Sequence, residues 1–310
     1  MKKLSRLDFV RQLKGEGLKF SELVLTSAGE YAADDSDWNY KDIPHLHVVH
    51  ELAEAYPAVI GDDIVCSINM QKILGVWFPV ALVNYEYAKH HQVYYTTLFF
   101  FALIIETKTE EYEPLMSRVT TTYSIGFPLW LFWAVPLIKM LLRKNYKNLM
   151  STDIPMRDRR GALRKIGYSM YKKGDTYTFP ETTHITAINI APPPDRSRVV
   201  QCTYPSLLET SNDVLVGDIG LLGFRLTRNG DEVTILPRTC PHEGACVEKA
   251  DFSSGTARCP WHGRVLRPIG KFIWKQNASF KTDIYKVEVT GDRLTVEYTG
   301  QMTASCADAA

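Results

Sequence analysis

Two short cysteine–histidine pairs constrain the fold of this 310-residue chain more than any other feature. They are Cys240-Pro-His242 and Cys259-Pro-Trp-His262, each in a Pro- and Gly-bearing stretch, with sixteen residues between them. Two thiolates and two imidazoles can hold two irons, one by each kind of ligand, or a single zinc ion. A zinc finger keeps its cysteines in one pair and its histidines in the other, whereas both pairs here are mixed. The pattern favours a [2Fe–2S] cluster; a zinc module and four unrelated loop residues are the alternatives.

The stretch from residue 200 to residue 297 resembles the Rieske [2Fe–2S] family, through the two pairs and the flanking "GFRLTRNGDEVTILPRTCPH". Rieske proteins of cytochrome complexes carry an extra cysteine in each loop and a serine soon after the second histidine. Here Cys246 has no counterpart in the second loop, and Arg264 stands where that serine would be. Fewer hydrogen bonds to the cluster sulfurs predict a low reduction potential, as in soluble electron-transfer and oxygenase proteins.

Composition limits the other classes of function. The chain is 45% hydrophobic and 23% charged with a net charge of +1, which gives no electrostatic reason to expect nucleic acid as a partner. The first residues lack the apolar segment and cleavage site of a signal peptide, so a cytoplasmic protein is expected. The apolar window 125–138 contains two prolines and is shorter than the ~20 residues of a membrane-spanning helix. A helix lining an apolar cavity is the preferred interpretation, and attachment to a membrane surface the other.

The order of sequence patterns predicts two domains. A polar leader reaches about Trp38, long antiparallel strands follow over 63–127, a helix over 136–150 and further strands over 176–190. The proline-rich stretch 191–198 is typical of a stiff linker, and short strands separated by turns follow it. We therefore expect a catalytic domain over 1–195, a Rieske domain over 196–300 and a loose tail over 301–310.

The stretch "NYKDIPHLHVVH", residues 39–50, contains the second group of candidate ligands. It resembles the mononuclear-iron motif of Rieske oxygenases, in which Asn39, Asp42, His45 and His50 have the required spacing. An oxygen-activating ferrous site needs two imidazoles and one carboxylate on one side, with other positions open. Histidines five residues apart suit a π-bulge or a kink better than a regular helix. Without the cluster motif, ordinary surface or core histidines would be the better interpretation, with Asp42 as a helix N-cap.

The third ligand must come from another segment. "LMSTDIPMRDRR", residues 149–160, resembles the segment of the ketosteroid-hydroxylase branch in which an acidic residue followed by Ile-Pro binds the iron. On that resemblance Asp153 is the ligand and Asp158 the second choice. A cap or turn residue is the ordinary alternative for Asp153.

The resemblance implies an α+β chain, with a START-like helix-grip catalytic domain followed by a small all-β Rieske domain. It implies a monooxygenase that uses O2, a mononuclear Fe(II) and electrons from a ferredoxin or an NAD(P)H-dependent reductase to hydroxylate a hydrophobic small molecule. Asp42 would link the two metal sites across neighbouring subunits of a homotrimer. The order of the two domains departs from the family, where the Rieske domain comes first. The alternative is a Rieske electron carrier whose residues 1–195 bind a lipid or a partner protein.

Overall fold

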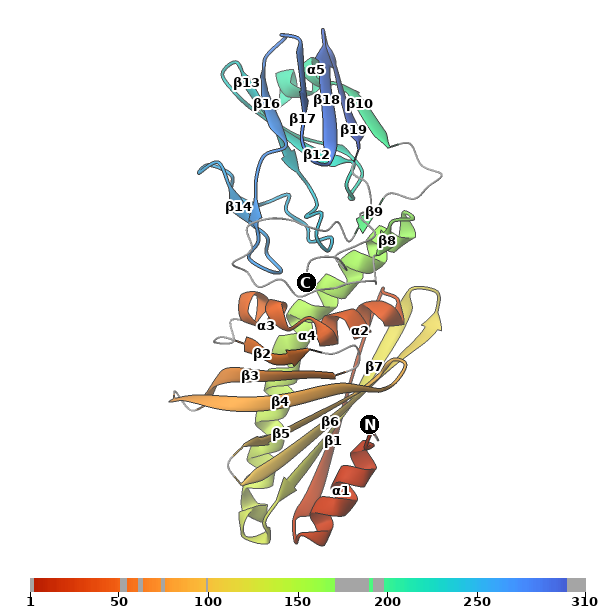
Figure 1. Ribbon diagram of the computed structural model, residues 1–310, viewed down its shortest axis with the longest axis vertical. Coiled ribbons are helices and arrows are strands. Elements are labelled where there is room, and N and C mark those ends of the chain that lie inside the picture. The colour runs from red at the N-terminus through yellow and green to blue at the C-terminus, as the bar shows by residue number, and fades with distance from the viewer. Residues whose placement is uncertain are drawn as a thin grey trace. The chain divides into compact units, whose positions relative to one another are not determined.

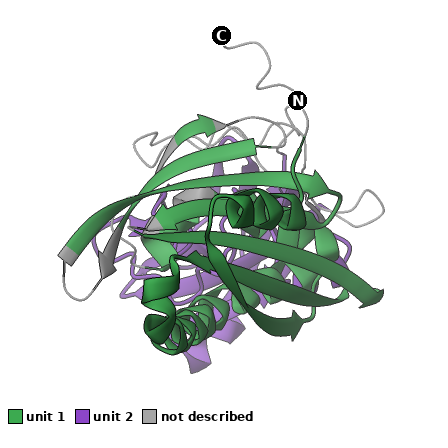
Figure 2. Ribbon diagram, turned by 90° about the horizontal axis from the view of Figure 1, so that it is seen from below, with its two compact units in different colours: residues 1–161 green, residues 162–310 purple. Residues whose placement is uncertain are grey.

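The computed structural model describes residues 3–50, 55–60, 64–73, 76–98, 100–170, 190–191 and 198–299. The chain forms two compact units, residues 1–161 and residues 162–310 (Figure 2). This division falls within a long helix, earlier than the domain boundary expected at residue 195. The strand expected over 176–190 lies outside the described residues except at Ile190, as do the tail 301–310 and most of the linker 191–198.

Unit 1 contains a seven-stranded antiparallel sheet in the order β1-β7-β6-β5-β4-β3-β2 (Figure 1). The β-branched and aromatic run over 63–127 supplies five of these strands, which confirms the antiparallel strands expected there. The expectation of a polar leader was wrong. Residues Lys19–Gly29 form a strand that pairs with the strand Met116–Phe127. The strands are β1 (Lys19–Gly29), β2 (Ala55–Ile60), β3 (Ile64–Ile73), β4 (Val76–Ala88), β5 (His91–Leu98), β6 (Phe101–Glu113) and β7 (Met116–Phe127).

The two faces of the sheet contact different helices, because successive side chains of a strand alternate between faces. Helix α1 (Arg6–Gly15) packs Val10 against Val93 and Ile104 on one face. Helix α4 (Val135–Lys165) packs on the other face, where Tyr146 lies in a cluster with Tyr123. A large antiparallel sheet with a long helix on one face, followed by a β-rich unit, makes the chain a mixed α+β protein.

Helix α4 has 31 residues and continues through Pro155, so the expected helix over 136–150 was too short. Proline has no N–H for the helical hydrogen-bond ladder, so one bond is missing inside this helix. Tyr146, Met150, Asp153 and Arg157 are all buried, and their spacing of three to four residues puts them on one helix face. Packing of that face outweighs the missing hydrogen bond.

The apolar window 125–138 is not one helix lining a cavity. It comprises the end of β7, the 3-10 helix η1 (Leu129–Ala134) and the start of α4, with Pro128 between strand and helix. In the described part of the chain, no helix combines the length and the apolar character needed to cross a bilayer.

Unit 2 is β-rich and has one large hydrophobic core. Two four-stranded antiparallel sheets, β10-β19-β18-β17 and β11-β12-β13-β16, enclose Phe224, Ile235, Val287 and Val296. The elements are β8 (Ser169–Met170), β9 (Ile190–Ala191), β10 (Val199–Thr203), α5 (Tyr204–Thr210), β11 (Asp213–Gly217), β12 (Gly223–Asn229), β13 (Glu232–Pro237), β14 (Ala257–Arg258), β15 (Val265–Leu266), β16 (Gly270–Ile273), β17 (Ala278–Lys281), β18 (Tyr285–Thr290) and β19 (Arg293–Tyr298).

Candidate metal centres

Three of the predicted iron ligands meet inside unit 1. One nitrogen of His45, one of His50 and a carboxylate oxygen of Asp153 all lie within 4.8 Å of one another. His45 is in helix α3 (Ile43–Val49), His50 follows that helix directly, and Asp153 is in α4. Their side chains are 3%, 4% and 8% exposed, so the group is shielded from solvent. Two histidines and one carboxylate in this arrangement suit a ferrous ion with open coordination positions.

The five-residue spacing of the histidines is accommodated by the end of a helix, and not by the π-bulge or kink that the sequence predicted. Helix α3 ends at Val49, and His50 leaves it with φ −98° and ψ 0°. Its ring can therefore turn back toward His45, to a ring-centroid distance of 5.1 Å. His47 lies within α3, and its side chain is outside the described residues.

A threonine fixes the tautomer of His50. The Thr152 hydroxyl donates its one proton to the Leu149 carbonyl at 2.9 Å, so it accepts from Nδ1 of His50 at 3.0 Å. The proton of a neutral His50 is then on Nδ1, and Nε2 presents a lone pair 2.9 Å from Oδ1 of Asp153. Two such atoms need a proton or a cation between them at that distance. A bound cation would fill that place.

His45 lies between two carboxylates. Nε2 is 3.6 Å from Oδ1 of Asp153, and Nδ1 is 3.5 Å from Oδ2 of Asp42. Burial acts to lower the pKa of His45, but Asp153 and Asp42 outweigh it and raise the pKa to about 9. A proton on His45 thus balances the carboxylates when no metal is bound, and metal binding must displace it. Asp42 stands at the N-cap position of α3, but its side chain makes no capping hydrogen bond.

A buried arginine supports Asp153 from the side away from the histidines. Arg157 is fully buried, and its Nη2 lies 3.7 Å from Oδ2 of Asp153. It also donates to Oδ1 of Asn39 from Nε at 3.1 Å and from Nη2 at 2.6 Å. Nδ2 of Asn39 in turn lies 3.5 Å from Oδ1 of Asp153. Burial acts to raise the pKa of Asp153, but the two histidines and Arg157 outweigh it and hold that pKa well below its usual range.

The sequence analysis did not identify Thr152 and Arg157, although their spacing from Asp153 could have indicated both. Thr152 precedes the predicted ligand, and Arg157 follows it by four residues, the spacing at which helical side chains meet. Asp158, the second choice for the ligand, accepts a hydrogen bond from the Glu30 amide at 2.7 Å and does not join the histidines.

Helix α2 (Ala33–Lys41) carries Asn39 and is fixed directly against α4. Arg160 of α4 forms a buried ion pair with Asp35 of α2 at 3.0 Å. Gly161 permits the close approach of the chain just before α2, because a Cβ there would lie 1.9 Å from the Glu30 carbonyl oxygen. These contacts fix the position of α2 along the axis of α4, and so place Asn39 next to Asp153.

Polar side chains without partners occupy the sheet face that contacts α4. Gln92, Thr107 and Thr121 lie side by side across β5, β6 and β7 and are 1%, 4% and 2% exposed. Neither polar atom of Gln92 nor either threonine hydroxyl has a hydrogen-bond partner among the described residues, nor do the buried hydroxyls of Tyr40, Tyr94 and Tyr146. Buried polar atoms normally have a partner. These atoms are therefore suited to water or to a bound molecule.

Replacing Thr107 or Thr121 with valine is expected to raise the free energy of unfolding by up to about 1 kcal/mol. The isosteric change removes a buried hydroxyl that has no hydrogen-bond partner in the described part of the chain. Thr96→Val is the matched control, because its hydroxyl donates to the Ala81 carbonyl at 2.7 Å, and it should lose about 1 kcal/mol. Urea unfolding of the three variants measures both effects. Equal losses in all three would show that Thr107 and Thr121 are already satisfied.

In unit 2 the two predicted cluster loops have the same backbone geometry. The Cys240 amide donates to the Ala245 carbonyl, and the Gly244 amide donates to the Cys240 carbonyl. The Cys259 loop repeats both bonds with Arg264 and Gly263. Gly244 and Gly263 have φ of 94° and 66°, a region that favours glycine. The repeated Cys-Pro-x-x-Gly spacing therefore encodes two equivalent loops.

The loops bring like ligands together. Cys240 and Cys259 are each 1% exposed and are hydrogen-bonded through their thiols, which lowers the pKa of Cys259 and raises that of Cys240. The rings of His242 and His262 meet edge to face at 5.1 Å between centroids. Among the described residues, these four do not form a group in which three ligand atoms lie within 4.8 Å of one another. One thiol pair and one imidazole pair suit two irons, each bound by one pair.

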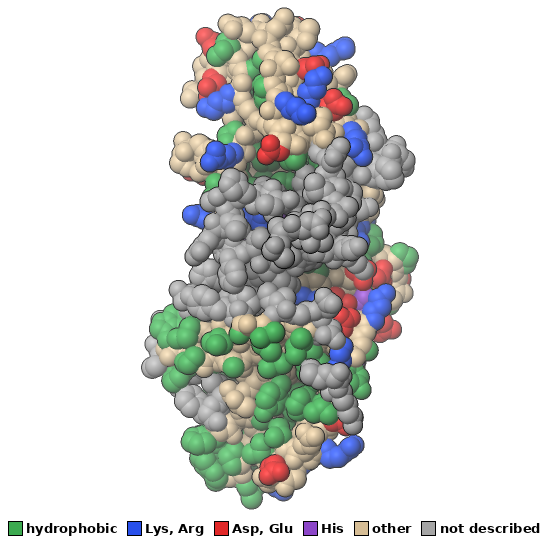
Figure 3. Space-filling view, viewed as in Figure 1, with side chains coloured by type: hydrophobic (Ala, Val, Ile, Leu, Met, Phe, Trp, Pro, Cys, Tyr) green, Lys and Arg blue, Asp and Glu red, His purple; other side chains and the backbone are tan. Residues whose placement is uncertain are grey.

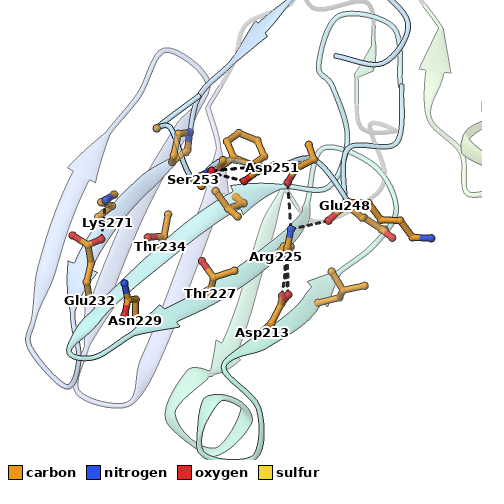
Figure 4. A pocket seen from close by; sticks show the side chains of 17 residues that line it. Asp213, Arg225, Thr227, Asn229, Glu232, Thr234, Glu248, Asp251, Ser253 and Lys271 are labelled. Carbon is orange, nitrogen blue, oxygen red and sulfur yellow. Dashed lines mark hydrogen bonds and ion pairs between the residues drawn. The ribbon is translucent and has the colours of Figure 1, made fainter. Parts of the chain in front are cut away.

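Among the described residues, a second group of possible metal ligands and a surface groove are weaker candidates than the two centres above. Asp34, Asp37 and His90 also gather their ligand atoms within 4.8 Å, but they are partly exposed, and Asp37 already contacts Nδ1 of His90 at 2.6 Å. An open groove on unit 2 runs over β11, β12, β13 and β16 (Figure 4). Arg225 crosses it to Asp213 at 2.7 Å, and no cluster residue lines it.

Comparison with known proteins adds similarities of fold only. No family model and no curated protein matches the chain. Solved structures similar to it include TTHA0849 from Thermus thermophilus, at 12% identity over 46% of this chain and 99% of that chain, with a TM-score of 0.39. The Zhui aromatase/cyclase from Streptomyces sp. R1128 is 9% identical over 46% and 96%, with a TM-score of 0.41. Dicamba monooxygenase bound to 3,6-dichlorosalicylic acid is 12% identical over 47% and 51%, with a TM-score of 0.36. At these scores, the side chains alone carry the inference about function.

Proposed function

We propose that this protein is a Rieske-type oxygenase that hydroxylates a small molecule. The observation that carries the proposal is the buried group His45, His50 and Asp153, together with a second, separate set of two thiols and two imidazoles in the same chain. An electron carrier needs only the second set. Burying two histidines against a carboxylate costs stability, and a domain that merely binds a lipid gains nothing from that loss.

Each residue of unit 1 would have a defined task toward the iron. His45 and His50 would bind through Nε2 and Asp153 through Oδ1, since these atoms face one another. Thr152 holds the His50 ring with its proton on Nδ1, and Arg157 with Asn39 orients the carboxylate. When bound, the ferrous ion would supply oxygen activation and the [2Fe–2S] cluster the electrons. Neighbours that fix ligand orientation in this way commonly change metal affinity about 10–100-fold when they are altered.

Asp42 would act as the link between the two centres. Its Oδ2 faces Nδ1 of His45, the nitrogen that points away from Asp153. A carboxylate that accepts from the outer nitrogen of a ligand orients the ring and raises its basicity. The same side chain would serve a cluster histidine of a neighbouring subunit in a homotrimer. Electrons would come from a ferredoxin or an NAD(P)H-dependent reductase.

The substrate proposed is a hydrophobic small molecule that carries at least one hydrogen-bonding group. Apolar residues such as Leu103, Ile105 and Tyr123 cover much of the α4-facing side of the sheet. The unpartnered atoms of Gln92, Thr107 and Thr121 lie on that same side and would bind a hydroxyl or carbonyl oxygen. Among the aromatic residues of this unit, Phe101 packs on this face next to Val135 of α4, whereas Trp77, Phe100, Trp130 and Trp133 are exposed.

Iron and acid-labile sulfide analysis tests the proposal. Purified holoprotein is expected to hold three irons and two sulfides per chain and to consume O2 when reduced in the presence of substrate. Two irons with two sulfides and no oxygen consumption would indicate the electron carrier instead. A colourless protein with one zinc and no sulfide would contradict both.

A further inference from the structure

Aromatic and aliphatic side chains gather on the surface where β7 leads into α4. Figure 3 shows hydrophobic side chains over this part of unit 1. Phe100, at the turn between β5 and β6, packs its ring 5.5 Å from that of Trp130. We call this set the η1 patch: Phe100, Leu129, Trp130, Phe132, Trp133 and Leu137, whose side chains are 63%, 66%, 62%, 67%, 72% and 51% exposed. Contiguous exposed apolar side chains of this size mark a surface that is covered in use.

Basic side chains follow the patch along α4. Lys139 is half-buried and Arg143, Lys144 and Lys147 are exposed; we call these four the basic collar. None of the four forms an ion pair within the described residues. The sequence from 114 to 152 contains no aspartate or glutamate at all. This surface therefore has a positive charge that nothing in the same segment balances.

The η1 patch and the basic collar follow one another along the axis of α4. Leu137 and Lys144 are seven residues apart on the exposed side of α4, which corresponds to about 10 Å along the axis. Interfacial helices bury their apolar side about 5–10 Å into the boundary between headgroups and acyl chains. With the η1 patch at that depth, the basic collar reaches the headgroups. Tryptophan prefers this same boundary, because its ring is apolar and its indole N–H is polar.

We propose that the η1 patch and the basic collar dock the protein on an anionic lipid bilayer. The side chains of the η1 patch would enter the lipid–water interface. The basic collar would bind acidic headgroups, and each basic residue would add to the attraction. A second copy of this chain fits the surface less well, since a symmetric contact would bring one collar against the other. Docking needs neither metal centre, so it stands or falls independently of the oxygenase proposal.

Flotation of the full chain with lipid vesicles tests the docking. Vesicles of phosphatidylcholine with about 30% phosphatidylserine, an amount on the order of that in anionic leaflets, are compared with pure phosphatidylcholine. Binding is expected to the first and to fall as salt rises, because screening weakens contacts to the charged surface. Trp130→Ser combined with Trp133→Ser should weaken binding about tenfold or more, as should Lys144→Glu combined with Lys147→Glu.

Matched controls are available on unit 2. Leu215→Ser removes an apolar side chain that is 50% exposed, and Lys249→Glu reverses an exposed charge. Both variants should bind vesicles like the unmodified protein, and circular dichroism should show every variant folded. No flotation with anionic vesicles, or equal flotation of the tryptophan variant, would overturn the proposal. Dimers that dissociate on Trp130→Ser, seen by light scattering, would assign the surface to a second copy instead.

Discussion

Asp153→Asn is expected to remove one of three irons per chain and to abolish turnover, while the visible spectrum of the cluster is unchanged. The substitution keeps the shape of the side chain but removes the single negative charge among the three proposed ligands. A neutral amide balances a divalent cation poorly, so iron affinity should fall at least about 100-fold, beyond the usual effect of a supporting residue. Iron analysis after desalting, with absorption spectra of the same samples, measures both parts.

Asp158→Asn is the control for this experiment, because Asp158 lies on the same helix and accepts from the Glu30 amide, away from the histidines. It should keep all three irons. Asp42→Asn should also keep three irons and a reducible cluster, yet form product slowly, since its proposed role is in electron delivery and ring orientation. Full iron content in Asp153→Asn, or loss of the third iron in Asp158→Asn, would show that the ligand set is misassigned.

Cys259→Ser is expected to abolish the absorption and EPR signals of the cluster and to leave one iron per chain. Cys259 is buried and pairs with Cys240, so its loss removes one of the two thiolate ligands of one iron. Unit 1 has its own sheet and core, and its circular dichroism and iron should survive. In the unmodified protein the reduction potential should lie near the low end for Rieske centres, about −150 mV, because Arg264 replaces the serine.

Cys246→Ser provides the comparison within the same loop. Cys246 is exposed, and its replacement should change neither the spectrum nor the iron content. A cluster spectrum that persists in Cys259→Ser would disprove the assignment. A potential above about +100 mV would place the cluster in the high-potential branch and argue against an oxygenase.

The candidate ligands were all visible in the sequence. The repeated Cys-Pro-x-x-Gly spacing specifies two alike loops, because each glycine takes a positive φ where its own amide returns a hydrogen bond to the cysteine carbonyl. The strands over 63–127 could also be predicted, because alternation of side chains is a local property of the chain. Local rules thus account for both cluster loops and for most of the sheet of unit 1.

Helix limits were predicted less well, since they depend on distant contacts. The residue pattern predicted a helix only over 136–150, but burial of Met150, Asp153 and Arg157 on one face carries α4 through Pro155 to Lys165. The segment before Trp38 was expected to be a polar leader, but it contains strand β1. Its pairing with β7, about a hundred residues away, is what makes it a strand.

The sequence by itself determined which side chains are candidate metal ligands, because ligand type and spacing are local properties of the chain. Only the tertiary structure decided how these candidates are arranged. It joined Asp153 to His45 and His50, fixed the tautomer of His50 through Thr152 and supported the carboxylate with Arg157. It also divided the apolar window 125–138 between a strand, a 3-10 helix and the start of α4, where Ile125 and Val135 are buried and Trp130 and Trp133 are exposed. These features depend on which faces of separate elements meet, and packing between distant segments sets that, not the local pattern.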